Sequence, residues 1–236
     1  MKESTLKKGI ILRESVFNTS IIEHVKLMLP SFYTYIYYFE KNSVAINGKT
    51  IKELGLYLNP IFSEAVKYNI KQTKDCWGVI MPLNAPGRLK ITPKQALINL
   101  TNYYPEATNN ILSKKIATEK LNTLIQFLNN FSYDKNSIVQ DVGEHIIQKK
   151  GIVKVNELAK KFNCSTRFIQ KEFASNVGVA TKQYTRNIRF IYALVNYMGK
   201  KPWKAKTYHH FTHFKKDWDA VIKTPFTEKT YQILLN

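Results

Sequence analysis

Residues 155–173 read VNELAKKFNCSTRFIQKEF, and this stretch decides the fold of the second half of the chain. Its first apolar residues recur at i, i+3, i+4 and i+7, the spacing of one face of an α-helix: Val155, Leu158, Ala159 and Phe162. Asn163 follows, and this residue type tolerates the left-handed conformation in which helices often end. The pattern predicts a short helix that ends at residue 163.

A second short helix is predicted over residues 165–173. Ser165 can cap it, because its hydroxyl can accept a hydrogen bond from a free backbone amide of the first turn. Ile169 and Phe173 lie one turn apart and form its apolar face. Two short helices that meet across a tight turn form the helix-turn-helix, whose second helix lays its N-terminal side chains along base edges in the major groove.

The polar residues of this second helix suit DNA recognition. Arg167 can donate a bidentate pair of hydrogen bonds to guanine, and Gln170 can form such a pair with adenine. Ser165, Thr166 and Lys171 can reach bases or phosphate oxygens. A polar helix face is more often simply solvated, so neighbouring residues have to support the assignment.

The sequence here resembles the AraC/XylS family of bacterial transcription regulators. The resemblance rests on four stretches in order: VNELA at 155–159, STRFIQKEF at 165–173, VGV at 177–179 and YTRNIRF at 184–190. It implies a DNA-binding domain over 136–236, divided into a first reading unit at 151–180, a connecting helix at 181–199 and a second unit at 200–236. In the family, the two recognition helices enter successive major grooves on one face of DNA.

The connecting helix has a plausible length. Residues 181–198 would span about 27 Å at roughly 1.5 Å per residue, comparable with the roughly 34 Å of one duplex turn once the flanking units are added. Lys182, Arg186 and Arg189 lie along it. We expect them to hold DNA phosphates, with an ordinary solvated face as the alternative.

The second unit matches the family incompletely. Residues 208–218 read YHHFTHFKKDW, which by resemblance makes Thr212 cap or precede a helix that exposes Lys215 and Lys216, with His210 at the same end. The family has a support helix before this point, but only residues 200–207 (KKPWKAKT) are left for one. Either Trp203 replaces the missing apolar face or the unit is degraded. We expect the latter, so that binding depends on the first unit, dimerisation and phosphate contacts.

Two other groups of side chains near the C-terminus could bind a ligand: three histidines and four lysines. His209, His210 and His213 have no Cys nearby and no carboxylate before Asp217, so we expect no metal site. Four lysines at 200, 201, 204 and 206 suit phosphate, an acidic protein or an anionic membrane surface equally well.

The first half of the chain has a different pattern. Aromatic and β-branched runs at 31–39, 54–58 and 77–81, with turn signals at Asn47-Gly48 and Pro86-Gly87, predict short strands. Later apolar residues have helical spacing: Leu121, Leu124, Ile125, Leu128 and Phe131. This stripe is expected to pack on the strands, with dimerisation as the alternative. The polar segment 129–137 suggests a boundary, so residues 1–135 form the other predicted domain.

By the resemblance, this first domain is a small β-barrel-like sensing or dimerisation domain, which makes the whole fold α+β. Its aromatic residues alternate along one predicted strand: Phe32, Tyr33, Tyr35, Tyr37, Tyr38 and Phe39. They can fill a barrel interior or stack on an effector, and core packing is the expectation. The identity of an effector cannot be derived from these residues.

The composition limits the class of partner that this chain is expected to bind. Lys and Arg number 36 against 17 Asp and Glu, which gives a net charge of +19 and indicates a polyanionic partner. Residues 136–236 hold 18 basic and 7 acidic residues, a difference of +11, against 18 and 10, a difference of +8, in residues 1–135. The shorter domain therefore carries the denser positive charge.

Several other classes of protein are not expected from this sequence. The chain has no Gly-rich phosphate loop, nucleophile elbow or His-Glu-x-x-His pattern, and residues 84–88 suit a plain turn, so we expect neither an enzyme nor a cofactor. Two cysteines and a charged N-terminus indicate a reducing, cytoplasmic location without a membrane segment.

The sequence thus predicts a sequence-specific transcription regulator whose partner is double-stranded DNA. A homodimer and a small-molecule effector stay open. The alternative is a relative that no longer reads DNA and binds a protein partner through its helix at 121–131 or its basic tail.

Overall fold

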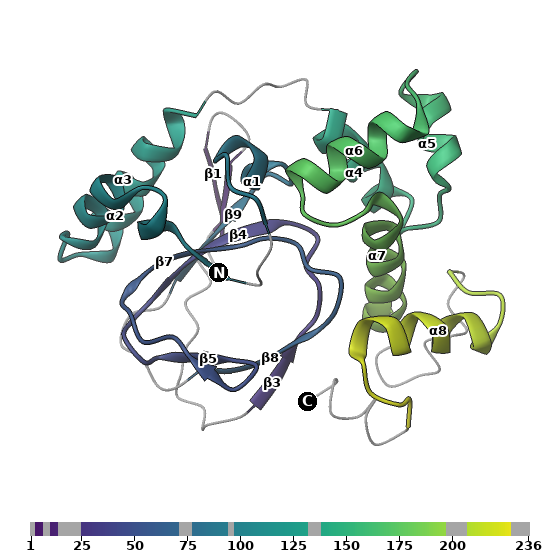
Figure 1. Cartoon of the computed structure of the whole chain (residues 1–236), viewed down its shortest axis with the longest axis horizontal. Coiled ribbons are helices and arrows are strands. Elements are labelled where there is room, and N and C mark those ends of the chain that lie inside the picture. Colours follow the sequence, from purple (N-terminus) through teal and green to yellow (C-terminus); the bar gives the residue numbers. More distant parts are fainter. Residues whose placement is uncertain are drawn as a thin grey trace.

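The strands of the chain lie in its first half and most of its helices in the second (Figure 1). A computed structural model describes residues 3–6, 10–13, 25–70, 77–93, 97–131, 138–196 and 207–227. The fold is α+β, as expected. The segment around the predicted boundary at 135/136 lies outside the described residues, so the boundary stays a prediction.

The central sheet has the order β10-β7-β4-β9, with strands β4 (Thr34–Phe39), β7 (Gly55–Asn59), β9 (Trp77–Met81) and β10 (Ile98–Asn99). All neighbours are antiparallel, and Ile36 of β4 lies opposite Leu58 on one side and Val79 on the other. All three side chains are fully buried. Aromatic and β-branched residues suit a pleated, packed surface, which explains why these runs form strands.

A second sheet has the order β3-β8-β5-β6, and two further strands pair only with each other, one of them packed against β9 of the central sheet. Their strands are β3 (Val25–Met28), β5 (Val44–Ile46), β6 (Lys49–Thr50), β8 (Val66–Ile70), β1 (Glu3–Leu6) and β2 (Ile10–Arg13). Asn47 and Gly48 join β5 to β6 with positive φ at both residues, which confirms the turn signal. The described strands form separate sheets, so a closed barrel is not observed.

Short helices cover one face of the central sheet: α1 (Ala85–Arg88), the 3-10 turn η1 (Leu100–Asn102), α2 (Pro105–Leu112) and α3 (Ala117–Asn129). Leu124 and Leu128 of α3 are buried in the same core as Ile36 and Val79. The predicted packing of this stripe on the strands is confirmed. Pro86 and Gly87 lie within the single turn of α1, so the segment expected to be a plain turn is helical.

The second half is helical: α4 (Ile138–Gln148), α5 (Val155–Lys161), α6 (Thr166–Asn176), α7 (Thr181–Asn196) and α8 (Phe211–Ile222). In Figure 1, α4, α5 and α6 lie together at one end of α7, and α8 crosses its other end. Our sequence analysis missed α4, although Val139, Val142 and Ile146 have helical spacing and are buried.

The strand half and the helical half share a core. Ile61 and Leu83 lie in one apolar cluster with Phe173 of α6 and Tyr184 of α7. The Leu83 amide donates a hydrogen bond to the side-chain oxygen of Gln140 at 2.9 Å. The Tyr184 hydroxyl donates to the Phe32 carbonyl, also at 2.9 Å. These contacts fix the helices relative to the sheets.

Gly151, between α4 and α5, lies directly against α7. Its φ is +71°, and a Cβ there would lie 2.4 Å from both the Arg189 nitrogen and the Thr185 carbonyl oxygen. These are backbone atoms of α7, which cannot rotate away. Only glycine fits this approach.

We therefore expect Gly151→Ala to lower the free energy of unfolding by about 3 kcal/mol, from left-handed strain and overpacking together. Gly48→Ala is the matched control, because Gly48 also has positive φ, +80°, but nothing lies within 4 Å of a Cβ there. Its cost should be about 1 kcal/mol. Urea unfolding followed by circular dichroism measures both, and equal costs would contradict the close approach.

Candidate nucleic-acid interface

The turn between α5 and α6 forms as the sequence predicts. The Lys154 amide donates to the Glu157 carboxylate at 3.0 Å and so satisfies a free donor at the start of α5. Leu158 and Ala159 are buried, and Asn163 has a φ of +49° after the helix. The left-handed asparagine lets the chain reverse within a few residues, which places α6 against α5.

Helix α6 is capped by Ser165, whose side-chain oxygen accepts a hydrogen bond from the Phe168 amide at 3.1 Å. Ile169 and Phe173 are buried, as predicted, and the helix continues three residues beyond the expected end to Asn176. The cap and the apolar face together determine which side of α6 points outward.

The proposed base-reading residues lie on that outward side. Ser165, Arg167, Gln170 and Lys171 are exposed, and Thr166 is half-buried. Free backbone amides at a helix N-terminus carry partial positive charge, which favours a phosphate at this end. The first turn of α6 therefore presents donors of several kinds to one outside partner.

Phe168 is a surface residue that our sequence analysis did not select. It lies in the first turn of α6 and is 44% exposed, although aromatic side chains are usually buried. The exposure of Phe168 could have been predicted from its position, because only residues 169 and 173 fall on the apolar face of this helix. An apolar side chain in the major groove can contact a thymine methyl group.

The three cations predicted to hold phosphate differ in their surroundings. Lys182 is exposed at the start of α7. Arg186 donates to the Ser63 carbonyl at 3.4 Å, and its Nε is buried without a hydrogen-bond partner among the described residues. Arg189 pairs with Asp217. Both arginines thus bond within the protein while Lys182 is exposed, and the phosphate contacts expected of all three stay predictions.

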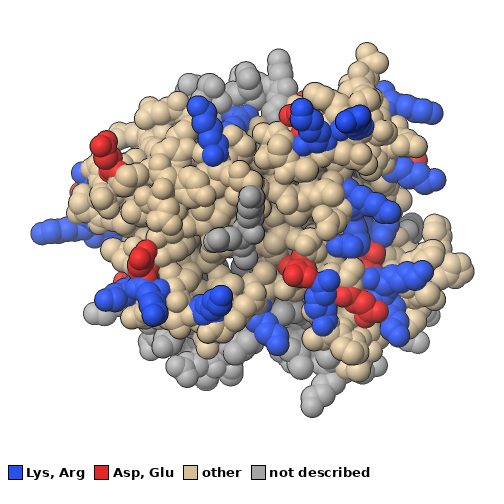
Figure 2. All heavy atoms as spheres, viewed as in Figure 1, with Lys and Arg blue, Asp and Glu red and all other residues tan. Residues whose placement is uncertain are grey.

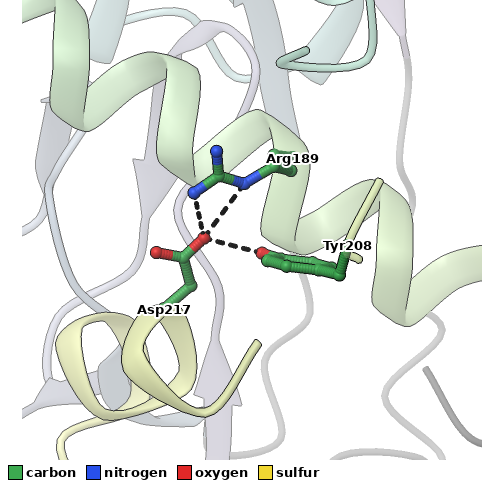
Figure 3. A network of polar contacts seen from close by, with 3 residues as sticks. All are labelled: Arg189, Tyr208 and Asp217. Atoms are coloured by element: carbon green, nitrogen blue, oxygen red, sulfur yellow. Dashed lines mark hydrogen bonds and ion pairs between the residues drawn. The ribbon is translucent and has the colours of Figure 1, made fainter. Parts of the chain in front are cut away.

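Arg189, Asp217 and Tyr208 form a polar network between α7 and α8 (Figure 3). The Arg189 Nε and Nη2 lie 3.1 and 2.5 Å from Oδ2 of Asp217, and the Tyr208 hydroxyl donates to the same oxygen at 2.8 Å. The Arg189 guanidinium carbon lies 5.2 Å from the centre of the Tyr208 ring. One carboxylate oxygen therefore joins the connecting helix to the second unit.

The surroundings of Arg189 and Tyr208 raise the pKa of both side chains, so the guanidinium stays charged and the hydroxyl stays protonated. Burial, followed by the charge of Asp217, raises the pKa of Tyr208, which keeps its hydroxyl protonated as a donor. Burial alone would lower the pKa of Arg189, but its hydrogen bond to Asp217 and the charge of that carboxylate raise it overall. The network is thus a charged pair with one neutral donor.

Helix α8 starts at Phe211, with His210 in the N-cap position. Thr212 therefore lies inside the first turn, and the expectation that it caps the helix by resemblance is not met. Lys215 and Lys216 are exposed, as predicted. Residues 197–206 lie outside the described part of the chain, so the predicted loss of a support helix there stays a prediction.

Helices α6 and α8 have the same pattern of burial. Counted from the N-cap residues Ser165 and His210, the fourth and eighth positions are buried in both: Ile169 and Phe173 in α6, Phe214 and Trp218 in α8. The fifth and sixth positions are exposed in both: Gln170 and Lys171 in α6, Lys215 and Lys216 in α8. Helix α8 thus presents side chains in the register of α6.

The histidines near α8 lie on the surface. His209, His210 and His213 are exposed, with the rings of the last two 5.9 Å apart. In the described part of the chain, no three His, Cys, Asp or Glu side chains gather as metal ligands would.

Basic side chains lie over both halves of the face drawn in Figure 2, more densely over the helical half. Figure 2 shows many blue Lys and Arg side chains on the right, where α5 to α8 lie in Figure 1, with a few red acidic ones between them.

None of the described helices is both long and apolar enough to cross a membrane.

No family model matches the chain, and no curated protein matches it. Among solved structures, it is similar to a crystal structure of ToxT from Vibrio cholerae O395, with a TM-score of 0.48 and 11% identity over 90% of this chain and 94% of that one. A 1.65 Å structure of ToxT from Vibrio cholerae gives a TM-score of 0.49 and 9% identity over 91% and 99%. At these values we draw the function from this chain's own residues.

The network of Figure 3 should matter for stability. Asp217→Ala leaves Arg189 without its partner, so we expect the free energy of unfolding to fall by about 2–3 kcal/mol. This is below the range for fully buried pairs, because the Arg189 side chain is 32% exposed.

Glu64→Gln is the control, since its pair with Lys223 is 51% and 59% exposed and should contribute less than about 1 kcal/mol. Urea unfolding measures both variants. A loss at Asp217 no larger than at Glu64 would show that the network does not hold α8 in place.

Proposed function

We propose that this chain is a DNA-binding transcription regulator that reads sequence with α6 in the major groove. The observation that carries the proposal is the orientation of α6. Its apolar side is buried against α5 and α7, and its capped first turn presents Arg167, Gln170 and Lys171 to the outside. A helix-turn-helix reads DNA with this part of its second helix.

Each exposed residue has a role in the proposal. Arg167 donates a bidentate pair to guanine and Gln170 forms one with adenine, whereas Lys171 and Thr166 reach bases or phosphates. Ser165 stays on the helix cap, because its side-chain oxygen already accepts the Phe168 amide hydrogen. Phe168 packs on a thymine methyl group.

Helix α8 supplies a second contact in this proposal. His210, Thr212, Lys215 and Lys216 are exposed on it and suit phosphate oxygens. Helix α7 has 16 residues, about 24 Å at roughly 1.5 Å per residue, so two reading helices at its ends suit grooves about one duplex turn apart. Lys182 adds a backbone contact near α6.

The regulator is expected to work in the cytoplasm, with double-stranded DNA as its partner and with the strand half as a sensing or dimerisation part. Its excess of basic residues predicts affinity that falls steeply with salt. A protein-binding relative of similar charge would show that fall without preferring one duplex.

Selection from a random duplex pool tests the proposal and yields the preferred site. On that site, Arg167→Ala or Gln170→Ala should cost about 1–3 kcal/mol and relax selectivity at one position. Lys182→Ala should weaken all duplexes alike and lower the salt slope by about 1.

Lys115→Ala removes an equal charge from an exposed site before α3 and should leave binding unchanged. Fluorescence anisotropy on the selected and a scrambled duplex measures all four variants. If the pool yields no preferred sequence, or Arg167→Ala binds both duplexes as the parent does, α6 does not read DNA.

The role of Phe168 can be tested without disturbing hydrogen bonds. Replacing single thymines of the site by deoxyuridine removes only the methyl group, so at one position the parent should lose roughly 1 kcal/mol of binding free energy, about the value of one buried methyl group. Phe168→Ala should bind both duplexes equally. Anisotropy titrations give the four affinities, and an equal loss in the variant would assign the methyl contact to another residue.

A further inference from the structure

We propose that residues 61–65 of the strand half are the support of α8, in the place that α5 holds for α6. The proposal rests on the proposed function, because it concerns how the second reading helix is positioned. Ile61, Phe62, Ser63 and Ala65 are positioning residues that need not touch DNA themselves, whereas the exposed Glu64 between them is not expected to act.

The first unit shows what such a support does. Leu158 and Ala159 of α5 lie in one core with Ile169 and Phe173 of α6, so the exposed side of α6 has a fixed direction. The sequence predicts that residues 200–207 are too few for a comparable helix and its two turns. On that prediction, α8 needs another element against its buried side.

The segment 61–65 contacts the C-terminal end of α8. The Ala65 amide donates a hydrogen bond to the Val221 carbonyl at 2.6 Å. Val221 lies in the last turn of α8, where carbonyl groups have no partner inside the helix. This bond satisfies one of them from outside, which ties the helix end to the strand half. The Lys223 ammonium lies 3.3 Å from the Glu64 carboxylate beside it.

Apolar packing adds to this bond. Ala65 and Leu29, both from the strand half, pack against the core that contains Phe214 and Trp218 of α8 and Phe190 of α7. Among the described residues, the buried face of α8 is thus covered by α7, by the strand half and by Phe226.

The same segment is itself anchored. Asn187 of α7 is fully buried and donates to the Phe62 carbonyl at 3.0 Å, and Arg186 donates to the Ser63 carbonyl. Ile61 lies in the core of the first unit. Five consecutive residues therefore reach the first core, the connecting helix and α8, which fixes the direction of α8 relative to α6.

Two variants of the full chain disturb the support in different ways. Ala65→Pro removes the amide hydrogen that Val221 accepts, and Ala65→Glu keeps that hydrogen but places a charge beside an apolar core. Glu64→Gln is the control, because the neighbouring ion pair is largely exposed and contributes little.

Hydrogen–deuterium exchange without DNA gives the first readout. Both Ala65 variants should exchange the α8 amides at least about 10-fold faster than the parent, with α6 unchanged, and Glu64→Gln should match the parent. Equal protection of α8 in parent and Ala65 variants overturns the proposal. Faster exchange of α6 and α8 together also overturns it, because the segment would then stabilise the whole chain.

DNA binding gives the second readout, which a purely structural role would leave unchanged. Lys215→Ala with Lys216→Ala should lower the salt slope by about 2, and Ala65→Glu should do the same. Combining all three changes should lower it no further. An additional fall would show that Ala65 acts apart from α8 and overturns the proposal.

The two proposals fail differently. If the parent selects no duplex, the proposed function fails, and the exchange experiment alone decides whether residues 61–65 hold α8. If the parent selects a duplex but α8 stays protected in both Ala65 variants, DNA reading stands and the support role fails.

Discussion

The burial of α7 on several sides is the constraint on which the rest of the structure depends. Tyr184 and Ile188 lie in the core of the first unit, and Phe190, Ala193 and Leu194 lie in the core of the second. A helix that is buried around most of its circumference has few places left to move. Helices α6 and α8 both take their direction from it, since each packs its apolar face on α7.

Polar groups make this burial specific. The Tyr184 ring packs at a tilt against the Phe173 ring, and its hydroxyl donates to the Phe32 carbonyl, so one side chain joins α6, α7 and the strand half. Burial raises its pKa well above the usual value, which keeps the donor hydrogen in place. Asn187 and Arg189 likewise use polar atoms to fix partners that apolar packing alone would leave free to slide.

Local patterns could be predicted from the sequence, and contacts between distant segments could not. The cap at Ser165, the left-handed Asn163 and the buried pair of α6 follow from neighbouring residues, and all were expected. The inward turn of Arg186 and Arg189 was not, because their partners, Ser63 and Asp217, are distant in sequence. The separate sheets were missed for the same reason, since strand pairing joins residues far apart. Helix α4 could have been predicted from the helical spacing of its apolar residues, but it was not.

The contacts of residues 61–65 with the first core, with α7 and with α8 have a consequence for the proposed binding of DNA. These contacts set the separation of α6 and α8 within the protein itself, before any partner binds. An extra base pair between two half-sites moves the second by about 3.4 Å along the axis and about 35° around it. If α6 and α8 bind DNA as proposed, a protein held together in this way cannot follow that screw motion, so its affinity would depend on half-site spacing as strictly as on base sequence.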